Sequence, residues 1–113
     1  MRRGEVWVAN LNPPRGTEVG KIRPVLIMQT DELLEAGMPT VVVLPLTTRL
    51  YPGKSRWRVS IPSRDRLLRE SQVIVDQPRS LDRTRLADGP LTRLTRDEME
   101  IVEHGLKSVL GLL

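Results

Sequence analysis

A charged side chain stands at the boundary of an apolar segment, where it could act on a phosphodiester. Arg23 precedes Pro24, and the apolar run behind it, residues 25–28, is typical of a buried strand. Because proline disfavours the α-helical region for the preceding residue, Arg23 is expected to be extended at the entrance of that strand. The arginine is therefore predicted to be a fixed cation beside a polar loop, residues 16–22, that has room for a ligand.

Other polar side chains are expected at strand ends or on a strand face, namely Glu18, Thr47, Thr48 and Asp76. A ribose 2′-hydroxyl can attack the adjacent phosphorus without a metal if protons are managed and the phosphorane is stabilised. Arginine and threonine can donate hydrogen bonds to the phosphorane, whereas a carboxylate, or the phosphate environment itself, has to manage the protons. Each residue alone can also be explained without a catalytic role, since an arginine before proline is more often a surface ion-pair partner.

The residue types that are missing exclude several other chemistries. The single histidine, His104, leaves no two-histidine acid–base pair and no histidine metal site, and it is expected to be a surface or packing residue. Cysteine is absent, which excludes disulfides and thiolate metal sites. The chain has no Walker-type phosphate loop and no Asp-x-Asp pair suited to magnesium. No cofactor or metal is therefore expected.

The net charge of the chain indicates what kind of molecule it binds. The formal net charge is +4, and 15 of the 18 basic residues are arginines. A basic domain of this size favours a polyanionic partner, and the planar arginine fork matches phosphate geometry. A solvated basic surface is the alternative. Aromatic residues are limited to Trp7, Tyr51 and Trp57, which argues against a stacking platform of the RRM kind.

Short strands and one clear helix are predicted to position these groups. The predicted strands are residues 5–11, 23–29, 40–46, 57–61 and 71–76, with a short edge strand at 85–91. One or two helical turns are expected over residues 31–36 with Gly37 as terminator, and a short helical connector over residues 65–68. Several strands without alternating βαβ units predict a mainly β fold, a small antiparallel barrel with a C-terminal helix.

Alternation and helical spacing predict which side chains face the core. Trp57, Val59 and Ile61 are expected inward, and so are Val73 and Val75. The terminal helix is predicted to begin with a capping box made by Thr95 and Glu98. Its apolar stripe is expected to contain Met99, Val102, Leu106, Val109 and Leu113.

The length of 113 residues predicts one domain, residues 1–113. No apolar run approaches the roughly 18 residues needed to cross a bilayer, and residues 1–3 lead into a polar strand without the apolar segment of a signal peptide. No membrane association is expected, and the cytoplasm is the simplest location.

Several short motifs together resemble a known family. They are Arg3-Gly4-Glu5-Val6-Trp7, Gly16-x-Glu18, Arg23-Pro24-Val25-Leu26-Ile27, Pro45-Leu46-Thr47-Thr48 and Asp76-Gln77-Pro78-Arg79-Ser80-Leu81-Asp82. In this order and at these separations, the chain resembles the MazF/PemK (Kid) family of toxin endoribonucleases from type II toxin–antitoxin modules. The resemblance covers essentially the whole chain.

This resemblance implies a CcdB/MazF-like, SH3-like barrel that forms a homodimer. It implies metal-independent, sequence-specific cleavage of single-stranded RNA, an mRNA interferase activity that leaves 2′,3′-cyclic phosphate and 5′-hydroxyl ends. Arg23 and Thr47 match the catalytic pair of the family, and Thr17 and Glu18 lie in the loop that encloses substrate. The RNA-binding residues expected here are Thr17, Glu18, Thr48, Lys54, Arg56, Asp76, Gln77 and Arg79.

The resemblance also implies a cognate antitoxin protein. An acidic segment of that antitoxin is expected to lie across a groove between loops 12–22 and 48–56. Basic residues of both loops supply the positive field there, namely Arg15, Lys21, Arg49, Lys54 and Arg56.

The chain departs from the family pattern at three positions. Val19 stands where glutamine is usual, and Thr17 where serine or histidine is common. Ile74 stands where some members carry an arginine proposed as proton donor, so that acid–base scheme does not transfer. The general acid and base are left open, and Asp76 is expected to contact or orient the substrate.

Two other functional classes remain as alternatives. CcdB-like relatives of the same fold poison DNA gyrase through a terminal Trp-Gly-Ile-type sequence. This chain ends Val109-Leu110-Gly111-Leu112-Leu113 without a tryptophan, which disfavours that reading. A catalytically inactive RNA- or protein-binding module is the third possibility, and RNA cleavage in EDTA separates all three.

Overall fold

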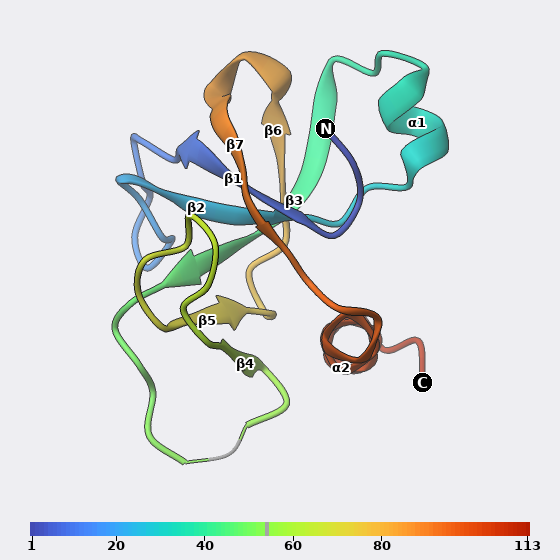
Figure 1. Cartoon of the computed structure of the whole chain (residues 1–113). Coiled ribbons are helices and arrows are strands. Elements are labelled where there is room, and N and C mark those ends of the chain that lie inside the picture. Colours follow the sequence, from blue (N-terminus) through green and yellow to red (C-terminus); the bar gives the residue numbers. More distant parts are fainter. Residues whose placement is uncertain (54) are drawn as a thin grey trace.

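The structure of the chain is a computed structural model that describes residues 1–53 and 55–113. Short strands dominate it, and the C-terminal helix lies to one side of the sheet (Figure 1). In chain order the elements are β1 (Glu5–Asn10), β2 (Ile22–Ile27), α1 (Asp31–Glu35), β3 (Thr40–Thr47), β4 (Arg58–Ile61), β5 (Ser71–Ile74), β6 (Arg79–Asp82), the 3-10 turn η1 (Arg83–Arg85), β7 (Leu86–Arg93) and α2 (Arg96–Val109).

β3 is the central strand of an antiparallel sheet. It pairs with β2, β5 and β6, as expected for a strand that is apolar on both faces. The strand order is β4–β5–β3–β2–β1–β7, and β6 is a further partner of β3. The predicted mainly β, antiparallel fold with a C-terminal helix is confirmed. Within the described residues, β4 and β7 are the two ends of this sheet.

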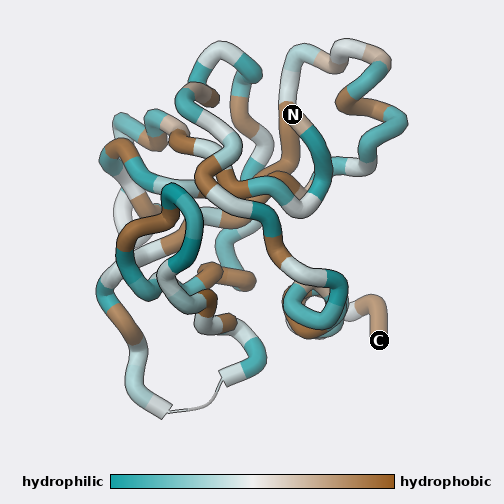
Figure 2. The backbone as a smooth tube through the Cα atoms, viewed as in Figure 1, coloured by the Kyte–Doolittle hydropathy of each residue, from teal (hydrophilic) through white to brown (hydrophobic). Residues whose placement is uncertain are grey.

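Alternate residues of β2 and β3 contribute to two hydrophobic cores, one on each face of the sheet. Leu26 and Leu44 belong to a core that also contains Met99 of α2. Val25 and Val43 belong to a second core on the other face. Figure 2 shows brown, hydrophobic stretches concentrated where the strands cross, with teal, hydrophilic residues in the surrounding loops.

The start of α2 confirms the predicted capping box. The Thr95 hydroxyl accepts a hydrogen bond from the Glu98 N–H at 3.2 Å, and the Thr95 N–H donates to Glu98 Oε1 at 2.8 Å. The apolar stripe is confirmed over most of the helix, since Met99 and Val102 are buried in the core and Leu106 and Val109 pack against it. It is wrong at Leu113, which is 68% exposed. The helix ends at Val109, before the stripe reaches that residue.

Two features differ from the expectation: β6 is an additional strand, and the connector at residues 65–68 is not helical. β6 pairs with β3, with Arg79 opposite Val43, whereas the segment after residue 76 was expected only to end a strand. The helical connector predicted at residues 65–68 is wrong, because Arg64 and Leu67 close a tight turn. Asp65 has φ of +50° in that turn, outside the region of a right-handed helix.

The short helix α1 matches its prediction closely. It begins at Asp31, and Gly37 follows its end with φ of +76°, as expected for a glycine terminator. The Asp31 carboxylate accepts a hydrogen bond from the Arg3 N–H at 2.7 Å, which ties α1 to the N-terminal segment. Among the described residues, no helix has the length and apolar character needed to cross a membrane.

Candidate active site

The register of β2 and β3 brings Arg23 and Thr47 together. The last paired residues of these strands are Val25 and Pro45. Continuing this antiparallel register by two residues places Arg23 opposite Thr47, on the same face of the sheet as Val25. Arg23 Nη1 lies 3.5 Å from the Leu46 carbonyl oxygen, which agrees with this placement. Two residues far apart in sequence are thus neighbours at one end of the sheet.

Both side chains line one open hollow of about 560 Å³, here called the Arg23 hollow. Thr48 contributes to it as well, so three of the predicted site residues meet there. The lining is completed by Lys21, Ile22, Pro24, Leu46 and Arg49.

The guanidinium of Arg23 is oriented but not neutralised. Its Nε donates a hydrogen bond to the Gly20 carbonyl at 2.8 Å. No salt bridge to Arg23 occurs in the part of the chain that the structure describes. The side chain is half-buried, and this burial lowers the pKa of the guanidinium. Among the described residues, Arg23 therefore keeps donor capacity, and a charge without a carboxylate partner, for an anionic ligand.

Thr47 is the last residue of β3, where the chain leaves the sheet as predicted. Its hydroxyl oxygen accepts a hydrogen bond from the Arg49 N–H at 3.1 Å. A threonine hydroxyl that accepts one bond keeps its own hydrogen for donation. Together, Arg23 and Thr47 can donate hydrogen bonds to a phosphate or phosphorane oxygen in the Arg23 hollow.

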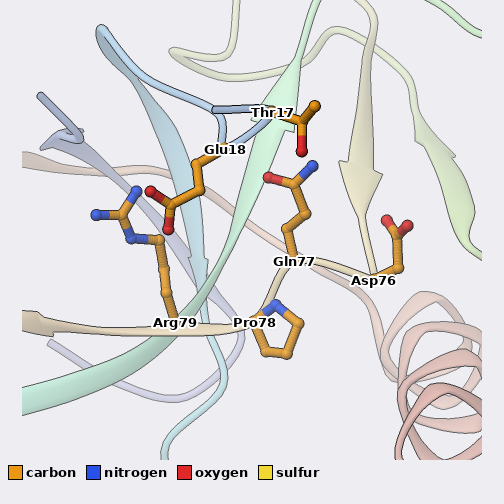
Figure 3. Close-up of a pocket in the computed structure, with 6 residues that line it drawn as sticks. All are labelled: Thr17, Glu18, Asp76, Gln77, Pro78 and Arg79. Carbon is orange, nitrogen blue, oxygen red and sulfur yellow. The ribbon is translucent and has the colours of Figure 1, made fainter. Parts of the chain in front are cut away.

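A second hollow of about 340 Å³ collects five more predicted site residues and is here called the Asp76 hollow. Figure 3 shows Glu18 and Gln77 pointing into the same space, with the Arg79 guanidinium beside Glu18. Asp76 is exposed at the other side of this space. The residues that line the hollow are Thr17, Glu18, Asp76, Gln77, Pro78 and Arg79.

The Asp76 hollow is built mainly by hydrogen bonds to the backbone of loop 12–22. The Val19 N–H donates to Gln77 Oε1 at 3.1 Å, and Arg79 Nη1 donates to the Val19 carbonyl at 3.2 Å. Loop 12–22 is therefore held against the segment between β5 and β6. The sequence predicted Gln77 and Arg79 as contacts for RNA, but these bonds to Val19 were not foreseen.

A third hollow, of about 390 Å³, was not predicted apart from Asp76 and is here called the Trp57 hollow. The guanidinium of Arg58 lies 5.9 Å from the centre of the Tyr51 ring, and that of Arg56 lies 5.5 Å from Trp57. The hollow is lined by Tyr51, Ser55, Trp57, Arg58 and Asp76. Asp76 thus belongs to this hollow and to the Asp76 hollow, which makes them neighbours.

The inward orientation predicted for Trp57 is wrong, since 44% of its surface is exposed. β4 begins only at Arg58, and the Trp57 N–H donates to the Ser55 hydroxyl in a turn before the strand. The alternation of the strand therefore does not extend to Trp57. Two aromatic side chains in a loop rich in polar residues were the signal available from sequence.

Arg56 is the remaining predicted site residue that the structure describes. Arg56 is exposed, and its backbone packs on Gly105 of α2, where an added Cβ would collide with the Arg56 carbonyl. This contact fixes the end of loop 48–56 on the helix. Lys54, also predicted to bind RNA, lies outside the described residues. Residues 1–53 and 55–113 contain no group of three or more histidine, cysteine, aspartate or glutamate side chains that could hold a metal ion.

Comparison with known proteins identifies the family. Residues 2–110 match the family described as "PemK-like, MazF-like toxin of type II toxin-antitoxin system". The chain is 39% identical over 113 residues to the endoribonuclease MazF of Staphylococcus saprophyticus, an alignment that covers 99% of this chain and 92% of that protein. The chain therefore belongs to the PemK-like, MazF-like toxin family of type II toxin–antitoxin systems, as its motifs predicted.

Solved structures agree with this assignment. MazF (Form-I) of Deinococcus radiodurans aligns with a TM-score of 0.80 at 26% identity, covering 98% of this chain and 96% of that one. The MazE–MazF (Form-II) structure from the same organism aligns with a TM-score of 0.75 at 25% identity, covering 100% of this chain and 97% of that one.

Proposed function

We propose that this protein is a toxin endoribonuclease that cleaves single-stranded RNA at short sequences without a metal ion, leaving 2′,3′-cyclic phosphate and 5′-hydroxyl ends. The observation that supports this most is that Arg23 of β2 and Thr47 at the end of β3 both line the open Arg23 hollow. Membership of a toxin family with a relative named as an endoribonuclease supports the same reaction class.

In the proposed reaction, the RNA 2′-oxygen attacks the adjacent phosphorus while the bond from phosphorus to the 5′-oxygen breaks. Negative charge builds up on the non-bridging oxygens of the phosphorane, where Arg23 and Thr47 donate hydrogen bonds. Because Arg23 is half-buried and has no carboxylate partner among the described residues, its charge is less screened than on an open surface.

The reaction also moves two protons, one from the 2′-hydroxyl and one to the 5′-oxygen. Ile74 is buried and has no proton to exchange, so the donor that some family members carry at this position is absent. Glu18 and Asp76 are the carboxylates that border the Asp76 hollow. We propose that Asp76 contacts or orients the substrate, and we leave the general acid and base unassigned.

RNA is proposed to pass from the Arg23 hollow toward the Asp76 and Trp57 hollows. Thr48 lines the first of these, and Thr17 and Glu18 line the second. Arg56 adds positive charge beside Trp57. Lys54, in the same loop, is retained as a proposed contact from sequence alone.

Two protein partners complete the proposal. The solved MazE–MazF pair supports a cognate antitoxin here, whose acidic segment would lie between loops 12–22 and 48–56 and compete with RNA. A second copy of this chain is also proposed, because apolar side chains near the C-terminus are more than half exposed. They are Ile101, Leu110, Leu112 and Leu113. Sedimentation at micromolar concentration tests the dimer, and a monomer there would contradict it.

Cleavage of a long RNA in the presence of EDTA tests the enzymatic proposal. We expect fragments whose 5′-hydroxyls accept a phosphate from polynucleotide kinase without prior phosphatase treatment. The Arg23→Ala variant, purified in the same way, controls for contaminating nuclease. Loss of cleavage in EDTA that magnesium restores would contradict the metal-free mechanism. Binding of RNA without any cleavage would indicate an inactive binding module instead.

A further inference from the structure

We propose that Gln77 and Arg79 are positioning residues that clasp the backbone of loop 12–22 and thereby orient Arg23 for catalysis. This inference rests on the proposed endoribonuclease function for its kinetic part. It assigns to both side chains a role other than direct contact with RNA.

The clasp consists of two hydrogen bonds to a single loop residue. Val19 donates its N–H to Gln77 Oε1 at 3.1 Å and accepts from Arg79 Nη1 on its carbonyl at 3.2 Å. Both polar groups of the Val19 backbone are thus satisfied by side chains, as a neighbouring strand would satisfy them. Gln77 lies in the segment between β5 and β6, and Arg79 is the first residue of β6, which pairs with the central strand β3.

Other described contacts of the loop tip are local. The Arg15 N–H donates to Glu18 Oε1, and the Glu18 N–H donates to the Arg15 carbonyl, so these bonds stay within the loop. Among the hydrogen bonds described for residues 13–19, those that Val19 makes with Gln77 and Arg79 are the ones that reach another part of the molecule. Losing them would leave the tip attached mainly through the half-buried Val19 side chain, which packs on the second core.

The next peptide links the clasp to Arg23. Gly20 follows Val19 directly, and its carbonyl accepts the 2.8 Å hydrogen bond from Arg23 Nε. Gly20 is buried, and an added Cβ would lie 2.7 Å from Pro14 Cγ, so Gly20 packs closely on another residue of the same loop. A displacement of Val19 therefore moves the acceptor that sets the orientation of the Arg23 guanidinium.

The other reading is that Gln77 and Arg79 bind RNA directly, since both line the Asp76 hollow. A direct contact made equally in the ground and transition states would change RNA affinity and leave the rate at saturating RNA unchanged. A positioning residue acts on the geometry of Arg23 and should change the saturating rate. The two readings thus differ in a measurable way.

The test compares variants that keep or remove one hydrogen bond. Gln77→Met removes the acceptor at similar length, whereas Gln77→Glu keeps an acceptor oxygen for the Val19 N–H. Arg79→Met removes the donor, and Arg79→Lys keeps a donor and the charge. We expect both methionine variants to lower the single-turnover rate at saturating RNA by about tenfold, because small misplacements of a reacting group are costly. Gln77→Glu and Arg79→Lys should restore most of that rate.

Arg83→Met is the matched control. Arg83 also donates to backbone carbonyls, those of Leu34 and Met38, at 3.0 and 3.2 Å, but these lie at α1 and away from loop 12–22 (Figure 1). We expect this variant to leave the saturating rate unchanged. Equal slowing by Arg83→Met and Arg79→Met would contradict a specific positioning role.

Hydrogen exchange at the Val19 amide provides a readout that needs no activity. In the full-length protein without RNA, we expect Gln77→Met to accelerate exchange at this amide about tenfold, while Gln77→Glu leaves it protected. Unchanged exchange in Gln77→Met would show that the clasp does not hold the loop. Weaker RNA binding at an unchanged saturating rate would assign Gln77 to direct contact. If wild-type protein cleaves no RNA, the proposed function fails, while the exchange result still decides the clasp.

Discussion

Two half-buried arginines of this chain, Arg23 and Arg64, have opposite surroundings. Arg64 donates to both carboxylate oxygens of Glu98, at 2.8 and 2.6 Å, and its Nε donates to the Thr92 hydroxyl at 3.2 Å. Arg23 makes one short hydrogen bond, to the Gly20 carbonyl, and has no carboxylate partner in the described residues. All three nitrogens of the Arg64 guanidinium thus donate hydrogen bonds within the protein. The Arg23 guanidinium is bound less completely.

The pKa values of the two groups shift in opposite directions for this reason. The hydrogen bonds that Arg64 donates to Glu98 raise the pKa of Arg64, whereas burial lowers the pKa of Arg23. Burying an uncompensated charge is costly, and such groups are common at functional sites. The comparison indicates that Arg64 stabilises the fold and that Arg23 is available to a ligand.

The largest expected effect separates the two roles directly. Replacing Arg23 by alanine should lower the single-turnover cleavage rate by about 10²–10³-fold, because a preorganised donor to the transition state is lost. RNA affinity should fall much less, and the free energy of unfolding should stay nearly unchanged. Single-turnover kinetics and urea unfolding measure these quantities. A loss of stability with an unchanged rate per folded molecule would place Arg23 with Arg64 as a structural residue.

Replacing Arg64 is expected to affect stability and not cleavage. Arg64→Ala should lower the free energy of unfolding by about 2 kcal/mol, because Glu98 loses a charged hydrogen-bond partner in a partly buried place. Cleavage per folded molecule should remain unchanged. Urea unfolding checks the first expectation and active-site-normalised rates the second.

Arg96→Ala is the matched control for this loss. The pair of Arg96 with Glu100 is long, at 3.6 Å, and its side chains are 91% and 64% exposed. Its removal should change the free energy of unfolding by less than about 0.5 kcal/mol. An equal loss in both variants would show that the partly buried network around Arg64 has no special importance.

The same contrast explains what the sequence could predict. The capping box of Thr95 and Glu98 was predictable, because both residues lie within one helical turn. The bond of Glu98 to Arg64 was not, because it joins residues 34 positions apart. Charge composition counts all arginines alike, although several of them donate to backbone carbonyls and stabilise loops. Examples are Arg79, Arg83 and Arg85.

The length and regularity of the apolar pattern decided which strands and helices could be predicted from the sequence. The central strand β3 and the helix α2 have long, regular apolar patterns, and both were predicted nearly to their ends. β6 has four residues of which Leu81 alone is buried, so it shows too little alternation to be recognised. That Arg23 and Thr47 line one hollow depends on the register of two strands, and the motifs indicated it only through the family resemblance.

The smallest expected effect is a dependence of stability on acid. Hydrogen bonds from Arg64 hold the pKa of Glu98 below its usual value of 4.5. The folded state therefore favours the charged carboxylate, and its contribution to stability is fully present above pH 4.5. That contribution is lost as the pH falls through the lower pKa of the folded state.

Glu98→Gln should consequently be less stable than the wild type near neutral pH, and the difference should shrink as the pH falls below 4.5. The change for this one group cannot exceed about 1.4 kcal/mol per pH unit. Arg23 has no carboxylate partner among the described residues, so Arg23→Ala should keep the acid dependence of the wild type. Urea unfolding of the three proteins between neutral pH and pH 3 measures these slopes. Parallel curves of unfolding free energy against pH for Glu98→Gln and the wild type would mean that Glu98 has the same proton affinity in the folded and unfolded chains. The contrast between Arg23 and Arg64 would then rest on hydrogen bonds without a charge effect.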